Sequence, residues 1–172
     1  MLKQLLSLYE KIEENKSKFD NLELNGDFFI DVYRTQPFQP ELYEYFSLPA
    51  IFVDYQMVGQ GKNKPRLITL TLHIVVDELP DASNISEQKE AGLQRFNYCL
   101  LLQSILEGCT LNKTTQLKFI SENIIDEQVV NYHSQTYEFE AYLSDMLGDT
   151  EYILGEFERL NIFGSLVKKL PK

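Results

Sequence analysis

The sequence lacks the features that usually identify an enzyme, a secreted domain or a membrane protein. It has no tryptophan, and only two cysteines and two histidines among its 172 residues. Two cysteines cannot build the disulfide framework of a small secreted domain, so we expect both to be free thiols in a reducing compartment. No apolar run approaches the ~20 residues that cross a bilayer, and the N-terminal segment becomes charged too early for a secretory signal. These absences predict a cytoplasmic protein that does not bind membranes.

Positive charge is also scarce, with 16 basic against 26 acidic residues and a formal net charge of −10. Binding to nucleic acid irrespective of sequence requires a basic surface that displaces counterions, so we expect no nucleic-acid-binding role. The charge is unevenly placed, because residues 120–160 hold ten acidic residues and one basic residue, Arg159. Lys62, Lys64 and Arg66 form a small basic cluster elsewhere. The acidic region is either a solvated face or one of two complementary patches between subunits.

Known catalytic and metal-binding patterns are absent as well. Residues 59–63 (G-Q-G-K-N) are too short for a phosphate-binding P-loop and lack its hydroxyl after the lysine. Residues 80–89 compress the spacing of a metal-dependent nuclease, and Glu87 is better explained as a helix-capping residue. His73 and His133 have no second His or Cys at the spacing of zinc ligands. We therefore expect no catalytic residue, no metal and no cofactor, and a protein that is not an enzyme.

What the sequence does contain is a long alternation of apolar and polar residues from Leu67 to Asp77. Such a period of two predicts a strand with one buried face. Shorter segments of similar character predict further strands at 28–34, 49–55, 117–120 and 129–143. The loop 58–65 is expected to join two of these strands as an antiparallel hairpin.

Two helices complete the expected layout. Leucines recur on one face from residue 2 to about residue 18, and Asn84 with Glu87 resembles a capping box that starts a second helix, ended by Gly108. A short helical turn is expected at 41–46. The predicted fold class is α+β, with a mixed, mainly antiparallel sheet of about four or five strands packed by an N-terminal and a central helix. Residues 1–145 form the expected domain, and residues 146–172 a C-terminal extension.

The order of these elements resembles that of the tail terminator proteins of long-tailed bacteriophages, which are the lambda-like minor tail proteins. The segments that carry the resemblance are the strand Leu48-Pro49-Ala50-Ile51-Phe52-Val53, a variable loop, the long strand 66–79 and a closing strand at 134–143. The resemblance covers residues 1–145. Two segments depart from the family, because residues 34–47 insert extra material and residues 146–172 extend past the usual end.

The resemblance implies a hexameric ring at the head–tail junction that caps the tail tube, stops its polymerisation and joins the tail to the head. The expected partners are other copies of the chain, the tail tube protein and a head-completion or connector protein. DNA would pass through the acidic ring lumen without binding. The protein would be cytoplasmic during assembly and part of the virion afterwards, and another neck or tail-completion role is equally compatible with the pattern.

The resemblance also suggests which residues meet a neighbouring subunit. Loop 56–64 would project toward the neighbour, and the basic cluster would face its acidic region in a head-to-tail contact. The residues expected at this interface are Gln60, Lys62, Lys64, Arg66, Glu138 and Glu140. The alternative is a monomeric cytoplasmic α+β module that binds a small ligand or a protein through its aromatic segment, residues 38–55.

Overall fold

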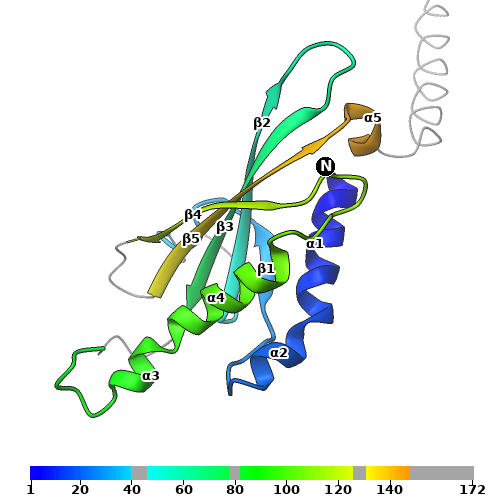
Figure 1. Cartoon of the computed structure of the whole chain (residues 1–172). Coiled ribbons are helices and arrows are strands. Elements are labelled where there is room, and N and C mark those ends of the chain that lie inside the picture. Colours follow the sequence, from blue (N-terminus) through cyan, green and yellow to red (C-terminus); the bar gives the residue numbers. More distant parts are fainter. Residues whose placement is uncertain (40–45, 78–81, 126–130, 148–172) are drawn as a thin grey trace, which may run out of the picture.

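The computed structural model describes residues 1–39, 46–77, 82–125 and 131–147 of the chain. They form an α+β fold in which a mixed, mainly antiparallel five-stranded sheet has the strand order β1-β2-β3-β5-β4 (Figure 1). The elements are α1 (Leu2–Glu14), α2 (Lys16–Asp20), β1 (Phe29–Val32), β2 (Ala50–Gly59), β3 (Arg66–Val76), α3 (Lys89–Leu93), α4 (Arg95–Leu106), β4 (Lys118–Ile125), β5 (Asn131–Ala141) and α5 (Leu143–Met146). The predicted fold class is therefore confirmed.

The predicted hairpin is formed by β2 and β3, which pair in register from Ala50 opposite Val75 to Gly59 opposite Arg66. The connecting turn contains Gly61 at φ +123°, a backbone conformation that favours glycine. The alternation in β3 has the expected result, because Ile68, Leu70, Leu72 and Ile74 are all fully buried. Strand β3 is central because β2 and β5 pair along both of its edges.

The two faces of the sheet are covered differently. Helices α1, α2 and α4 pack on one face, where residues such as Leu8, Phe19 and Leu102 join the buried side chains of β3 in the main core. The opposite face carries a smaller second core of Ala50, Phe52, Val75 and Tyr132, with half-buried side chains around it. Among the described residues, no helix is long and apolar enough to cross a membrane.

The predicted start of the central helix is wrong. Asn84 and Glu87 precede the first helical residue, Lys89, and the helical region is divided into α3 and α4 at Gln94. The hydroxyl of Ser86 accepts a hydrogen bond from the backbone N–H of Gln88 at 3.0 Å, which favours a turn over a helix there. The predicted end is confirmed, since α4 stops at Leu106 and Gly108 follows with φ +76°.

Other boundaries differ by several residues. Strand β2 continues to Gly59 rather than Tyr55, and β4 covers 118–125 rather than 117–120. Leu143 does not belong to the last strand, because it begins α5 and is 48% exposed. The helical turn expected at 41–46, the strand exit at 79–81 and most of the extension at 146–172 lie outside the described residues.

Candidate functional site

The outer part of β2 and its loop extend past the part of the sheet that the helices cover, and we call residues 54–66 the hairpin arm (Figure 1). The inner half of β2, from Ala50 to Val53, is buried, whereas every residue from Asp54 to Gly59 is exposed. Three of the exposed side chains are large and apolar: Tyr55 at 42%, Met57 at 37% and Val58 at 47%. Tyr55 and Met57 follow Ile51 and Val53 on the helix side of the sheet, whereas Val58 follows Phe52 on the other side, so apolar side chains are exposed on both faces of the arm. Because solvent-facing strand residues are usually polar, this exposure indicates a segment that meets a partner.

The arm also has an open backbone edge. Strand β1 pairs with β2 in parallel only from Ala50 to Val53, and Tyr33 adds one further bond to the Val53 carbonyl. Beyond Val53, no strand in the described parts of the chain pairs with the outer edge of β2. An unpaired strand edge can accept another strand, and proteins usually protect such edges with charge or cover. The hairpin arm therefore combines exposed apolar side chains with a strand edge whose backbone groups are unpaired within the described residues.

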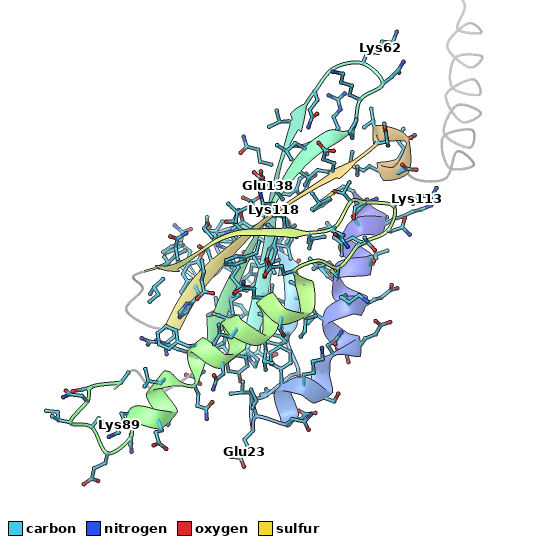
Figure 2. All side chains as sticks on the ribbon, in the orientation of Figure 1. Glu23, Lys62, Lys89, Lys113, Lys118 and Glu138 are labelled. Carbon is cyan, nitrogen blue, oxygen red and sulfur yellow. The ribbon has the colours of Figure 1, made fainter. Side chains whose placement is uncertain are left out.

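The residues predicted to form the interface do not all lie together. Lys62 lies at the tip of the arm (Figure 2), and both it and Lys64 are exposed. The side chain of Arg66 lies across Gly59, where a Cβ atom would collide with its guanidinium. No ion pair of Lys62 or Lys64 occurs within the described part of the chain. The basic cluster is therefore presented at one end of the molecule.

The acidic members of the predicted interface lie at the base of the same arm. Gln60 Nε2 donates a hydrogen bond to Glu140 Oε1 at 2.8 Å, so these two residues meet within one chain. Glu138 is opposite Lys118 in the pairing of β4 with β5, and Figure 2 shows the two labels side by side. Gln60 and Glu140 are thus brought together within one chain, and Glu138, which pairs with Thr69, lies further from the tip along β5.

The aromatic segment proposed as a ligand pocket behaves as core in its described part. The ring of Phe46 packs edge-on against Phe52 at 5.1 Å, and Phe29 lies 6.1 Å from both of these rings. Residues 40–45, which hold two of the tyrosines considered for the pocket, lie outside the described residues. The described aromatics cover the second core and contact one another. Packing in the second core therefore accounts for the described aromatic residues of this segment.

The contacts of His73 are those of a structural histidine. Its ring stacks on Tyr33 at 3.9 Å, and the Tyr132 hydroxyl lies 2.5 Å from its Nδ1 atom. Burial lowers the pKa of His73, and the nearby Asp54 carboxylate partly opposes that effect. The neutral imidazole and the Tyr132 hydroxyl therefore share a hydrogen bond whose direction depends on the tautomer of the ring. Burial in turn raises the pKa of Tyr132, which stays protonated.

The structure also brings together three polar residues that the sequence analysis did not connect. Cys99 of α4, Glu122 of β4 and His133 of β5 place one donor atom each within 4.8 Å of one another. Both Cys99 and His133 are about 1% exposed, whereas the side chain of Glu122 is 26% exposed and reaches the surface. No spacing rule could find this cluster, because its residues come from three separate elements. We call it the Cys–Glu–His cluster.

Neighbouring groups order this cluster. The Gln135 amide donates to the Cys99 carbonyl and to Glu122 Oε2, both at 2.8 Å, and Tyr137 donates to Gln135 Oε1 at 2.8 Å. Burial, and next the Glu122 charge, raise the pKa of the Cys99 thiol. Burial lowers the pKa of His133, with Glu122 opposing the effect. At neutral pH Cys99 is therefore a thiol and His133 a neutral imidazole.

Comparison with known proteins adds no identification. No protein-family model matches the sequence, and no curated protein is significantly similar to it.

Proposed function

We propose that the protein is a structural subunit of a ring at the head–tail junction of a long-tailed phage or prophage, where it terminates or completes the tail. The proposal rests on the order of elements described above and on the hairpin arm. In this role the protein is not an enzyme. Its partners are other copies of itself, the tail tube protein and a head-completion or connector protein. It is cytoplasmic during assembly and later part of the virion.

The hairpin arm is the observation that carries the proposal. Its outer strand has an open edge and exposes Tyr55, Met57 and Val58. A lone subunit gains nothing from exposing these side chains to water, whereas a subunit contact would bury them and stabilise the assembly by about 25 cal/mol for each Å² of apolar surface. An arm at one end of the subunit contacts a different surface on its neighbour, and such heterologous contacts close into rings.

The charges support the same arrangement. Lys62 lies at the tip of the arm and Lys64 in the same loop between β2 and β3, while the whole chain carries a formal charge of −10. A basic tip would be attracted to the acidic surface of a neighbouring copy, and this attraction would weaken as salt rises. A ring with an acidic inner surface would let DNA pass without adhering to it, because phosphates are repelled rather than neutralised.

The test is the molar mass of the purified protein, measured by light scattering over a concentration series, with negative-stain images of the main peak. We expect closed rings for the wild-type chain. Val58→Glu should reduce the mass to that of a subunit, because it puts a charge where the apolar contact forms. Leu22→Glu, which changes an equally exposed apolar residue far from the arm, is the matched control and should leave the rings intact.

Two results would contradict the proposal. One is a wild-type chain that stays monomeric at every concentration and salt level tested, which would favour the monomeric binding module instead. The other is a ring that survives Val58→Glu and dissociates in Leu22→Glu, which would remove the arm from the contact. Circular dichroism of each variant shows that a change in mass reflects assembly rather than unfolding.

A further inference from the structure

The Cys–Glu–His cluster has the geometry of a small metal site. The Nδ1 atom of His133 and the Oε1 atom of Glu122 are 3.4 Å apart. The Cys99 sulfur lies within 4.8 Å of one donor atom of each of these two residues. Two donors bound at about 2.0–2.3 Å in a tetrahedral shell are roughly 3.3–3.8 Å apart. The histidine–glutamate separation already has this value, and a small movement of the thiol would complete a three-donor face.

His133 supplies an independent observation that something is missing from the cluster. Its side chain is 1% exposed, yet neither of its ring nitrogens has a hydrogen-bond partner among the described residues. Glu122 Oε1 lies 3.4 Å from Nδ1, which is longer than an ordinary N–H···O hydrogen bond, so this contact satisfies the ring only weakly. Leaving a buried polar group unsatisfied is unfavourable, and native proteins rarely do so. A ligand that accepts the lone pair of a ring nitrogen would remove this penalty.

Gln135 prepares the carboxylate for such a ligand. Its amide donates to Glu122 Oε2, while Glu122 Oε1 is the oxygen directed at His133. The Gln135 amide is itself held by Tyr137, which donates to its oxygen, and both residues are fully buried. Outer hydrogen bonds of this kind fix the orientation of metal-binding side chains. Gln135 therefore holds one carboxylate oxygen of Glu122 and leaves the other beside His133.

We propose that Cys99, Glu122 and His133 bind one Zn²⁺ ion, with water in the fourth position. Sulfur, nitrogen and oxygen donors together suit a borderline-soft ion such as zinc, whereas magnesium and calcium require oxygen. On binding, the Cys99 S–H bond breaks, its proton passes to solvent, and the thiolate bonds to the metal. One thiolate, one carboxylate and one Zn²⁺ then sum to zero charge, which a mostly buried site tolerates.

The partly exposed side chain of Glu122 provides the route by which the ion reaches the cluster. Arg95 carries a positive charge that acts on both Cys99 and His133 and opposes binding of a cation. Its Nη1 atom donates to the Asn131 side chain. Bound zinc would connect helix α4 to the edge strand β4 and to β5. The site is thus a structural clamp, and it does not depend on the proposed ring function.

The test uses the purified full-length chain, freed of metal with a chelator and titrated with Co²⁺ and with Zn²⁺. Cobalt bound by a thiolate gives a near-ultraviolet charge-transfer band and visible bands of tetrahedral coordination. We expect these bands to saturate at one Co²⁺ per chain and to disappear when Zn²⁺ is added. Zinc alone should also raise the Tm of the metal-free protein.

Variants identify the donors. Cys99→Ser should abolish the charge-transfer band, and the matched control Cys109→Ser should keep it, because Cys109 lies after α4 and outside the cluster. Glu122→Gln changes a partly exposed residue and is the variant most certain to fold. Loss of a residue that only hydrogen-bonds to a metal ligand lowers metal affinity roughly 10–100-fold. Because Glu122 is proposed to bind the metal directly, its replacement should lower the affinity by more than that.

Two outcomes would overturn the proposal. A folded wild-type chain that shows no charge-transfer band with Co²⁺ has no thiolate site, and this measurement needs no variant. A band that persists in Cys99→Ser and is lost in Cys109→Ser would assign the metal to another part of the chain. In either case the Cys–Glu–His cluster would be a buried hydrogen-bonded group alone.

Discussion

Replacing Tyr132 by phenylalanine would test the second core, because it removes one hydroxyl and keeps the aromatic ring. The ring is 1% exposed and packs edge-on against Phe38 at 5.4 Å, so its hydrophobic contacts remain. The hydroxyl lies 2.5 Å from Nδ1 of His73, whose ring is stacked on Tyr33. In the variant this nitrogen loses its partner while its ring stays in place.

The cost follows from the orphaned nitrogen. A half-buried polar group left without its hydrogen-bond partner destabilises the folded state by about 1–3 kcal/mol. At about 3 °C per kcal/mol for a chain of this length, the Tm should fall by roughly 3–9 °C. Tyr142→Phe is the matched control, since it removes the same hydroxyl from a residue that is 51% exposed. Its effect should stay within about 0.5 kcal/mol.

Urea denaturation followed by circular dichroism gives the free energy of unfolding of both variants, and differential scanning calorimetry gives their Tm. The reasoning is refuted if Tyr132→Phe loses no more stability than Tyr142→Phe. It is also refuted if Tyr132→Phe loses as much as a large core truncation, because the ring packing would then have been disturbed.

Two further predictions concern the main core and pH. Leu102→Ala, at a fully buried position of α4, should cost about 2–5 kcal/mol in urea denaturation, whereas Leu100→Ala on the same helix, 61% exposed, should change stability by about 0.5 kcal/mol or less. Burial lowers the pKa of His73 below the 6.5 of an unfolded chain, so the unfolded state binds the proton more readily. Stability should therefore fall as pH drops below 6.5 toward the folded-state pKa, and His73→Gln should make that decline shallower in denaturation curves measured between pH 7 and pH 5. An unchanged slope would contradict the second prediction.

The sequence predicted those elements in which local pattern and tertiary packing agree. Alternation in β3 is regular because the helices cover one face of the strand from Ile68 to Ile74, where every second residue is fully buried. Strand β4 lies at the edge, where Ile120 and Ile124 are 43% and 62% exposed, and its pattern is correspondingly weak. The sequence predicted a loop for the outer part of β2, because polar and apolar residues such as Gln56 and Val58 follow no regular alternation there. A strand with no element packed on either face has no buried side, so its sequence need not alternate between apolar and polar residues.

Two other features depended on information that is not local. The spacing of Asn84 and Glu87 fits a capping box, but the nearby serines form turns instead. The hydroxyl of Ser83 accepts a hydrogen bond from the backbone N–H of Ile85, and that of Ser86 accepts one from Gln88. The Cys–Glu–His cluster arises only when α4, β4 and β5 come together. Cys99 and His133 are 34 positions apart in the sequence, so neither suggested the other. The resemblance to tail terminators, by contrast, used only element order.

The central position of β3 has a consequence for the protein during its synthesis. One edge of β3 is paired at once by β2, its neighbour in sequence, but the other edge waits for β5. From the end of β3 at Val76, another 65 residues must be translated before Ala141, the end of β5, is made. At about 5–20 residues per second this takes roughly 3–13 s. During that interval the nascent chain presents its most apolar strand half-paired, and we expect chaperones that bind extended apolar segments to engage it there.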